Sequence, residues 1–168
     1  VPMNNCSQAP QTDATRAAVD AYLRSWARDG MDWDAWMAEV ERARQSFARL
    51  INADIDEVAV TSSVSQAASA LASALSFDGD RRRVLASAAE FPTVGHVWLA
   101  QEPRGAEVGW VPLSDRGTID VSDYATRIDE RTRVVSACHA YFVNGFKHDV
   151  AAIARLAHAR GALLFVDA

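Results

Sequence analysis

From residue 57 onward, the hydrophobic pattern of the chain switches repeatedly between the period of a strand and the period of a helix. Short apolar runs predict strands at residues 57–61, 83–87, 107–111, 133–138 and 162–167. Apolar positions at helical spacing predict helices between them, at 64–77, 92–101, 121–128 and 149–160. Strands that alternate with helices predict an α/β fold with a mostly parallel sheet and helices on both of its faces.

The first fifty residues follow a different pattern, without strands. Residues 1–11 are polar with two prolines, which predicts an extended segment, and Thr12 or Asp13 then caps a helix that runs to about residue 28. A second helix is predicted at 33–53, where tryptophans share one apolar stripe and are expected in a core or an interface rather than in a binding site. We therefore expect two parts: residues 1–50 as an extended segment with helices, and residues 51–168 as the sheet-forming domain.

Composition narrows the classes of function. The chain has 168 residues, the size of one domain, and 49% of them are hydrophobic, as in globular proteins. The net charge is −5 and no basic stripe stands out, so we expect no nucleic-acid partner. No apolar run reaches the length of a membrane span and no leader peptide is apparent, which favours a cytoplasmic protein. Cys6 and Cys138 form neither a disulfide framework nor metal-ligand spacing, so no metal site is expected.

A hydroxyl-rich turn at residues 61–66 is the first candidate for chemistry. It reads Thr-Ser-Ser-Val-Ser-Gln and lies where a predicted strand meets a predicted helix. A helix N-terminus offers unpaired N–H groups and the positive end of the helix dipole, and Ser63 and Ser65 add hydroxyl donors, which would suit a phosphate. The alternative is an ordinary serine N-cap. The turn is not a P-loop, because the glycines and the lysine of that motif are missing.

Asp167 is the second candidate, since it ends the apolar run at 162–166. Open α/β sheets bind ligands beyond the carboxyl ends of their strands. A carboxylate placed there could keep the ring nitrogen of a cofactor protonated; the alternatives are a magnesium ligand or a cap on a neighbouring helix. Together, the turn and Asp167 predict a cofactor with a phosphate at one end and a basic ring nitrogen at the other.

Three further residues could face the same cleft. Phe91 follows a predicted strand and could stack on a planar cofactor, or else pack at the start of its helix. His139, in the loop at 139–145, could contact substrate or cofactor, although a single histidine near a strand end is more often structural. Asn5 is a polar residue of the N-terminal segment that could reach the cleft.

These elements in this order resemble the class V aminotransferase family, which are fold type I pyridoxal-phosphate enzymes and include cysteine desulfurases and kynureninases. The strongest likeness is at 149–168, which resembles the family's helix, a Gly-Ala pair, and a strand that ends in Val-Asp-Ala. The resemblance implies that Asp167 pairs with the pyridine nitrogen and that Phe91 stacks on the ring. It also implies that Val64 and Ser65, which follow Ser63, cradle the phosphate of pyridoxal 5'-phosphate.

The chain departs from the family pattern at several positions. Ser63 stands where relatives often have glycine, and Phe142 where desulfurases often have an asparagine that contacts the cofactor. The family's Schiff-base lysine comes well after the Val-Asp-Ala strand, and Lys147 precedes the helix at 149–160 and does not match it. We therefore expect no catalytic residue within these 168 residues and no activity from them alone. The resemblance implies that the intact protein is a homodimeric enzyme acting on an amino acid.

Several alternatives remain open at this stage. The reaction could be that of a desulfurase or other lyase, a transaminase, an epimerase or a kynureninase-like hydrolase. The chain could instead be a catalytically dead relative that serves as a scaffold, or a non-enzymatic α/β binding module of the receiver or flavodoxin type. A receiver would show clustered early acids and a late lysine, and a Rossmann dehydrogenase a glycine-rich first turn; the sequence shows neither.

Overall fold

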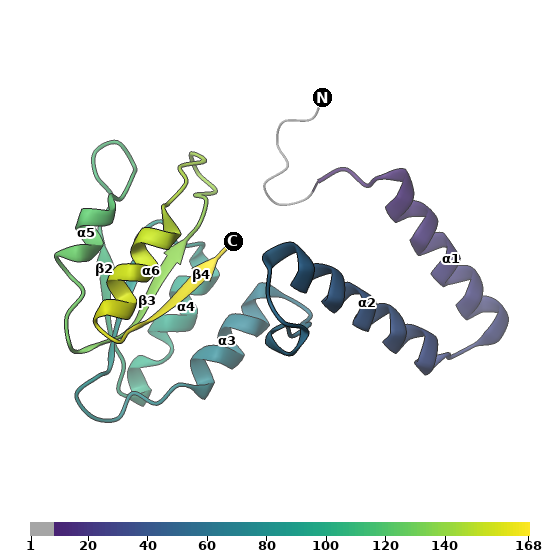
Figure 1. Cartoon of the computed structure of the whole chain (residues 1–168), viewed down its shortest axis with the longest axis horizontal. Helices are drawn as coiled ribbons and strands as arrows, with labels where there is room; N and C mark the ends of the chain where they lie inside the picture. The colour runs from purple at the N-terminus through teal and green to yellow at the C-terminus, as the bar shows by residue number, and fades with distance from the viewer. Residues whose placement is uncertain (1–8) are drawn as a thin grey trace. The chain divides into compact units, whose positions relative to one another are not determined.

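The computed structural model describes residues 9–168 and is shown in Figure 1. The chain divides into two compact units, one that ends at Thr61 and one that runs from Ser62 to Ala168. The first unit holds two α-helices and a short 3₁₀ helix, and the second holds four strands with the helices that connect them. Among the described residues, no helix combines the length and the apolar character that crossing a bilayer requires.

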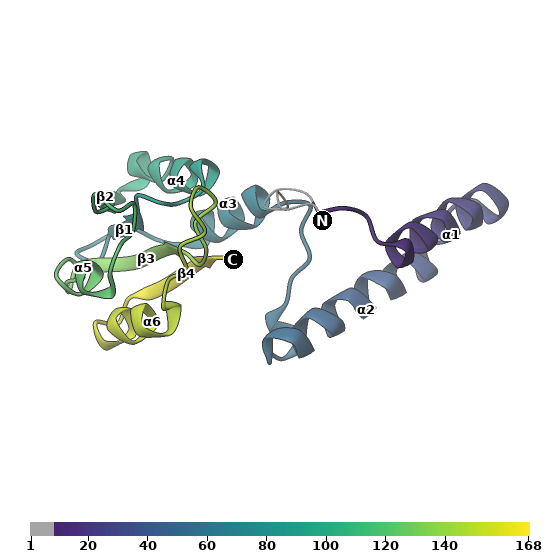
Figure 2. The same cartoon turned by 90° about the horizontal axis from the view of Figure 1, so that it is seen from above.

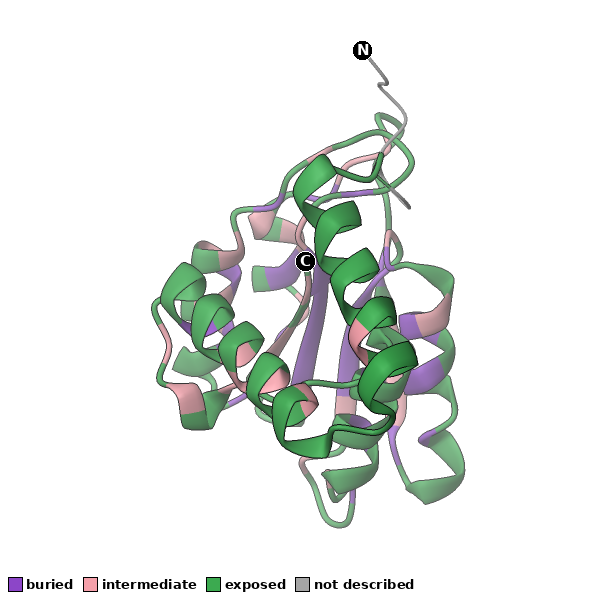
Figure 3. Cartoon of the chain, turned by 90° about the vertical axis from the view of Figure 1, so that its right-hand side faces the viewer, coloured by how far each residue is buried: buried purple, intermediate pink, exposed green. Residues whose placement is uncertain are grey.

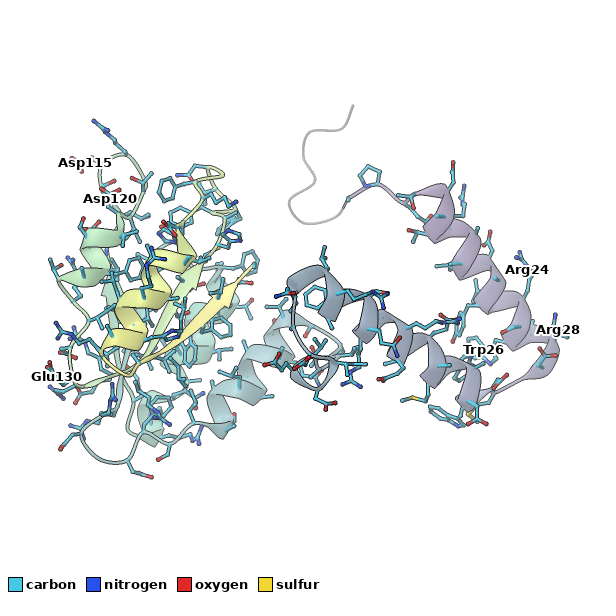
Figure 4. The ribbon with its side chains drawn as sticks, in the orientation of Figure 1. Arg24, Trp26, Arg28, Asp115, Asp120 and Glu130 are labelled. Carbon is cyan, nitrogen blue, oxygen red and sulfur yellow. The ribbon has the colours of Figure 1, made fainter. Side chains whose placement is uncertain are left out.

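The helices of the first unit are α1 (Asp13–Asp29) and α2 (Trp33–Ile51). As expected, threonine caps the first: the Thr12 side chain accepts a hydrogen bond from the Thr15 N–H over 3.1 Å. The aromatic rings of the two helices pack on one another; that of Trp26, labelled in Figure 4, lies edge-on to that of Trp36 at 6.3 Å. This cluster remains open to solvent, since Trp26 is 51% exposed, and Figure 3 draws most of both helices in the exposed colour.

The strand predicted at 57–61 is wrong. Ile55–Glu57 forms a 3₁₀ helix, and residues 58–61 have no regular structure. A capping box between Asp54 and Glu57 starts this turn. The Arg44 guanidinium then donates to the carbonyl oxygens of Ile55 and Val58 over 2.8 and 2.9 Å. Because the second of these bonds engages a carbonyl group that a strand at 57–61 would need for pairing, this short apolar run does not become a strand.

The second unit is built on a four-stranded sheet, and all three strand pairs are parallel, in the order β2-β1-β3-β4. The strands are β1 (Arg83–Ser87), β2 (Glu107–Val111), β3 (Thr132–Cys138) and β4 (Leu163–Asp167). The helices are α3 (Val64–Ala74), α4 (Pro92–Leu99), α5 (Val121–Ala125) and α6 (Val150–Ala159). The predicted α/β fold with a parallel sheet is confirmed, and β1 and β2 have the predicted bounds.

The helices cover both faces of the sheet, as predicted. In Figure 2, α3 and α4 lie on one side of the strands, and α5 and α6 on the other. The period of two along the strands explains this arrangement. Val84 and Ala86 belong to the core beneath α3 and α4, whereas Leu85 belongs to the core with Tyr124 of α5 and Ile153 of α6.

Several helices end earlier than the sequence pattern predicts, and α3 shows why. It was expected to reach residue 77 and ends at Ala74. The Arg104 guanidinium, from the short 3₁₀ helix Glu102–Arg104, donates to the carbonyls of Ala72, Ser73 and Leu75 at 3.3, 2.9 and 3.3 Å. A side chain distant in sequence thus satisfies the orphan carbonyls at the end of this helix.

Gly161 directly follows Arg160, the C-cap of α6, and is in the left-handed region with φ 67°. A Cβ there would lie 2.8 Å from Nη1 of Arg81, whose other terminal nitrogen, Nη2, donates a hydrogen bond to the Thr132 carbonyl. We expect Gly161→Ala to lower the free energy of unfolding by about 2–3 kcal/mol, through backbone strain and displacement of Arg81. Urea unfolding followed by circular dichroism measures the loss.

Gly145→Ala is the matched control for this prediction. Gly145 has a similar φ of 71°, but a Cβ there would meet nothing within 4 Å. Its substitution therefore carries the backbone strain without the clash. Equal losses for the two variants would contradict the role given to Arg81.

Candidate functional site

The carboxyl ends of the strands form one edge of the sheet, and the predicted site residues gather there. Cys138 is the register partner of Asp167 where β3 and β4 end. The pairing continues past β3, because the His139 N–H donates to the Asp167 carbonyl over 2.7 Å. Asp167 is therefore held by the backbone of its neighbour strand, and its side chain projects from a fixed point of the edge.

Glu90 completes a cluster with these two residues. A carboxylate oxygen of Glu90, the Cys138 sulfur and a carboxylate oxygen of Asp167 all lie within 4.8 Å of one another. Glu90 follows β1 and is only 7% exposed. The sequence pattern points to Phe91 rather than Glu90, although an acid three residues after a buried strand is a signal that could have identified Glu90.

A buried chain of hydrogen bonds orients Glu90. The indole N–H of Trp98 donates to the Ser136 hydroxyl over 2.9 Å, and that hydroxyl donates to Oε1 of Glu90 over 2.7 Å. The other oxygen, Oε2, is buried and has no hydrogen-bond partner among the described residues. One oxygen of the carboxyl is thus anchored, while the second is left for a partner outside this chain of bonds.

Burial governs the proton affinities of the cluster. Desolvation raises the pKa of Glu90 to about 7 against the opposing hydrogen bond from Ser136, and Asp167 adds to the rise. Desolvation also raises the pKa of Asp167, and it raises that of Cys138 to about 11 with the help of both acids. Among the described residues, no cationic side chain contributes to these shifts. The cluster is therefore suited to a cationic group brought by a ligand.

The shifted pKa of Glu90 makes stability depend on pH. Because the folded-state value of about 7 exceeds the usual 4.5, stability due to Glu90 is fully present below the lower value and is lost as pH rises through the upper one. We expect the wild-type chain to lose about 2–3 kcal/mol of unfolding free energy relative to Glu90→Gln across this window. Urea titrations at constant salt measure it, and a difference independent of pH would contradict the shift.

The turn at 63–65 forms the N-terminus of α3. The Ser63 side chain accepts from the Gln66 N–H over 3.2 Å, so the interpretation as an N-cap is confirmed. The Gln66 side chain in turn accepts from the N–H and hydroxyl of Ser62. Val64 and Ser65 occupy the first turn, where N–H groups have no acceptor within a helix. Whether this turn also binds a phosphate stays a prediction.

The N-terminus of α3 lies on the side toward which the strands point, in both Figure 1 and Figure 2. The turn and Asp167 thus share one side of the second unit. A ligand that engages both would span the space between them.

Phe91 and Phe142 form an aromatic corner at the same edge. Phe91 is the N-cap residue of α4, and its ring meets that of Phe142 edge-to-face at 5.2 Å. The two residues remain 48% and 49% exposed. Beside them is a cavity of about 300 Å³ whose lining includes Glu90, Leu113 and Phe142. An exposed aromatic face next to the cluster is consistent with stacking on a planar ring.

The loop after β3 is held by its own polar groups. The Asn144 side chain donates to the Gly117 carbonyl over 2.8 Å and accepts from the Phe146 N–H over 3.0 Å. His139 is partly buried, and its contact with a substrate stays a prediction. Asn5 lies outside the described residues.

Comparison with known proteins matches residues 11–168 to the family model of class-V aminotransferases. The chain is 35% identical over 164 residues to the uncharacterized aminotransferase YcbU of Bacillus subtilis, which covers 98% of this chain and 43% of that protein. It is 34% identical over 136 residues to a probable cysteine desulfurase of Methanothermobacter thermautotrophicus. This match covers 77% of the present chain and 32% of the desulfurase. The chain thus spans less than half the length of these relatives.

A solved structure, that of a NifS-like protein, has the same fold. It superposes with a TM-score of 0.83 at 20% identity and covers 98% of this chain and 48% of its own.

Proposed function

Because the chain belongs to the class V aminotransferase family, we propose that it forms the cofactor-binding part of an enzyme that acts on an amino acid with pyridoxal 5'-phosphate. The observation that carries this proposal is the position of Asp167. Its carboxylate stands at the carboxyl edge of a parallel sheet, near the Glu90 carboxyl, one oxygen of which is buried without a partner among the described residues. No cation among the described residues contributes to its shifted pKa.

The residues present fit the cofactor. A protonated pyridine nitrogen would supply the cation that the acid cluster lacks. The first turn of α3 offers Val64, Ser65 and the helix dipole to a phosphate, with Ser63 as the cap. The half-exposed ring of Phe91 offers a face to the pyridine ring. A ring with a cationic nitrogen at one end and a phosphate at the other suits this set of groups.

Each group of the chain has a distinct task in this proposal. When bound, the cofactor supplies a conjugated ring that draws electrons from the substrate's reacting carbon. Asp167 accepts a hydrogen bond from the ring nitrogen and keeps the proton there. The α3 turn holds the phosphate and so sets the position of the ring, and Phe91 covers one ring face and excludes water from it. His139 and Asn5 are proposed to lie near the substrate.

The reaction itself rests on residues outside this sequence. The names of the relatives favour two classes, transamination and desulfuration or other lyase chemistry, and a kynureninase-like hydrolysis is the third. We assign residues 51–168 to the N-terminal part of the large domain of a homodimer. The lysine that binds the cofactor would come from a later segment, so the 168 residues alone are expected to be inactive.

The test of the proposal is the intact mass of the full-length protein before and after borohydride reduction, with an absorbance scan of the native sample. A stable adduct with the mass of reduced pyridoxal phosphate, together with an absorbance band from the bound cofactor, is the expected result. A protein that binds no pyridoxal phosphate would instead be a scaffold that has lost catalysis.

Ser65→Ala tests the phosphate turn. We expect about a tenfold loss of affinity for pyridoxal phosphate, because one hydrogen bond to a charged group is removed, and no change for pyridoxal, which lacks the phosphate. Equilibrium dialysis with both ligands measures the two affinities. Ser122→Ala is the matched control, since Ser122 is likewise the second residue of its helix, α5. An equal loss for both ligands would count against phosphate binding at this turn.

A further inference from the structure

We propose that Glu90 is a positioning residue for Asp167. Its free oxygen, Oε2, carries a proton and donates it in a hydrogen bond to the Asp167 carboxylate, directly or through one water. The two carboxyls then share one proton and present a single negative charge. The identity of the group that faces this pair, a ring nitrogen, rests on the proposed function; the shared proton does not.

The geometry of Glu90 supports this role. Ser136 holds Oε1, and Trp98 holds Ser136, so the carboxyl group has one anchored side. Oε2 is buried without a hydrogen-bond partner among the described residues, and the Glu90 and Asp167 carboxyls have oxygens within 4.8 Å of each other. That separation is spanned by one water, or closed by rotation of the partly exposed Asp167 side chain. A buried oxygen with nothing to accept is satisfied once it becomes a donor.

The surrounding groups favour one shared proton. The titratable groups that interact with Glu90 come from β4, β3, α5 and the loop after β3: Asp167, Cys138, Tyr124 and Tyr141. Two carboxylates this close repel when both are ionised, and burial adds to that cost. The Cys138 thiol donates to the Ala140 carbonyl over 3.1 Å and is therefore not the donor for this pair. Glu90 is the group with the deeper burial, so it holds the proton, and Asp167 holds the charge.

One negative charge matches one protonated ring nitrogen. Ionisation of both acids would place two charges beside one cation and would turn the Asp167 carboxylate away from Glu90. The neutral Glu90 carboxyl instead donates to Asp167 and so orients the Asp167 carboxylate. The same task can be done by the amide of glutamine, which is neutral, has the same shape and also donates.

The first experiment titrates the carboxyl carbons of Glu90 and Asp167 by NMR in the ligand-free 168-residue chain. In the wild type, Glu90 is expected to titrate near 7, with a linked step in the Asp167 signal. Asp167→Asn is expected to lower the Glu90 midpoint by on the order of one pH unit. A Glu90 midpoint that this substitution leaves unchanged would show that burial alone sets it, and would overturn the shared proton.

The second experiment measures how the full-length protein distinguishes pyridoxal phosphate from its 1-deaza analogue, in which carbon replaces the ring nitrogen. Glu90→Ala is expected to reduce the preference for pyridoxal phosphate about tenfold, whereas Glu90→Gln retains it. If Glu90 is needed only for folding, Glu90→Ala would weaken the binding of both ligands equally, and that result would overturn the positioning role. If the wild type binds neither ligand, the proposed function fails, while the titration still decides whether the proton is shared.

Discussion

Replacing Asp167 with asparagine in the full-length protein is expected to lower turnover of its amino acid substrate by about 10²–10³. Asparagine has the same shape but no charge, so the ring nitrogen would lose the partner that keeps it protonated. The backbone bond between His139 N–H and the Asp167 carbonyl is unaffected by the change. The fold should therefore survive, and the loss should be in kcat rather than in the amount of folded protein.

The measurement is a turnover assay over a panel of L-amino acids, normalised to the best wild-type substrate, with circular dichroism to verify folding. Asp115→Asn is the matched control: it makes the same chemical change at an exposed loop residue, labelled in Figure 4, and should leave activity unchanged. A fully active Asp167→Asn enzyme would remove the central support of the proposed function.

Replacing Trp98 with alanine is expected to cost about 3–5 kcal/mol of unfolding free energy. The side chain is fully buried and packs edge-on against Phe165 at 5.5 Å. The substitution leaves a large cavity and also removes the donor to Ser136. Since natural domains are stable by about 5–15 kcal/mol, this one change would bring the second unit close to unfolding.

Urea denaturation followed by far-ultraviolet circular dichroism measures that cost. Trp98→Phe separates the two contributions, because it retains most of the packing and loses the indole N–H; we expect about 1–2 kcal/mol for it. Trp33→Ala is the control for deleting a tryptophan, since Trp33 is 62% exposed. A loss for Trp98→Ala no larger than for Trp33→Ala would contradict the importance given to this core.

The sequence pattern predicts each of the four observed strands and the edge at which they end, although it adds a strand at 57–61 that does not form. Strands β1 and β2 were predicted with their observed bounds because their apolar runs are short and are flanked by polar residues. The edge position of Asp167 followed from the same pattern, since parallel strands end together. The N-cap at Ser63 was available from residue type alone.

What the sequence could not show depends on contacts between distant residues. The segment at 57–61 has the short apolar run of a strand, but Arg44, from α2, engages its Val58 carbonyl. The end of α3 is determined by Arg104, some thirty positions further along the chain. The proton affinity of Glu90 depends on its burial beside Ser136, a residue of another strand. No local pattern encodes these three contacts.

The strand order also has a consequence for how this unit folds. Every neighbour of a strand is reached through a crossover: β1 pairs with β2 and β3, and β4 adds only to β3. No hairpin joins two strands of this sheet, and each strand pairing must first close a long loop. Such a topology is intrinsically slow to fold and leaves apolar strands unpaired in the meantime. During synthesis, the β1–β2 pair can form early. The other edge of β1 stays unpaired until β3, residues 132–138, has been made.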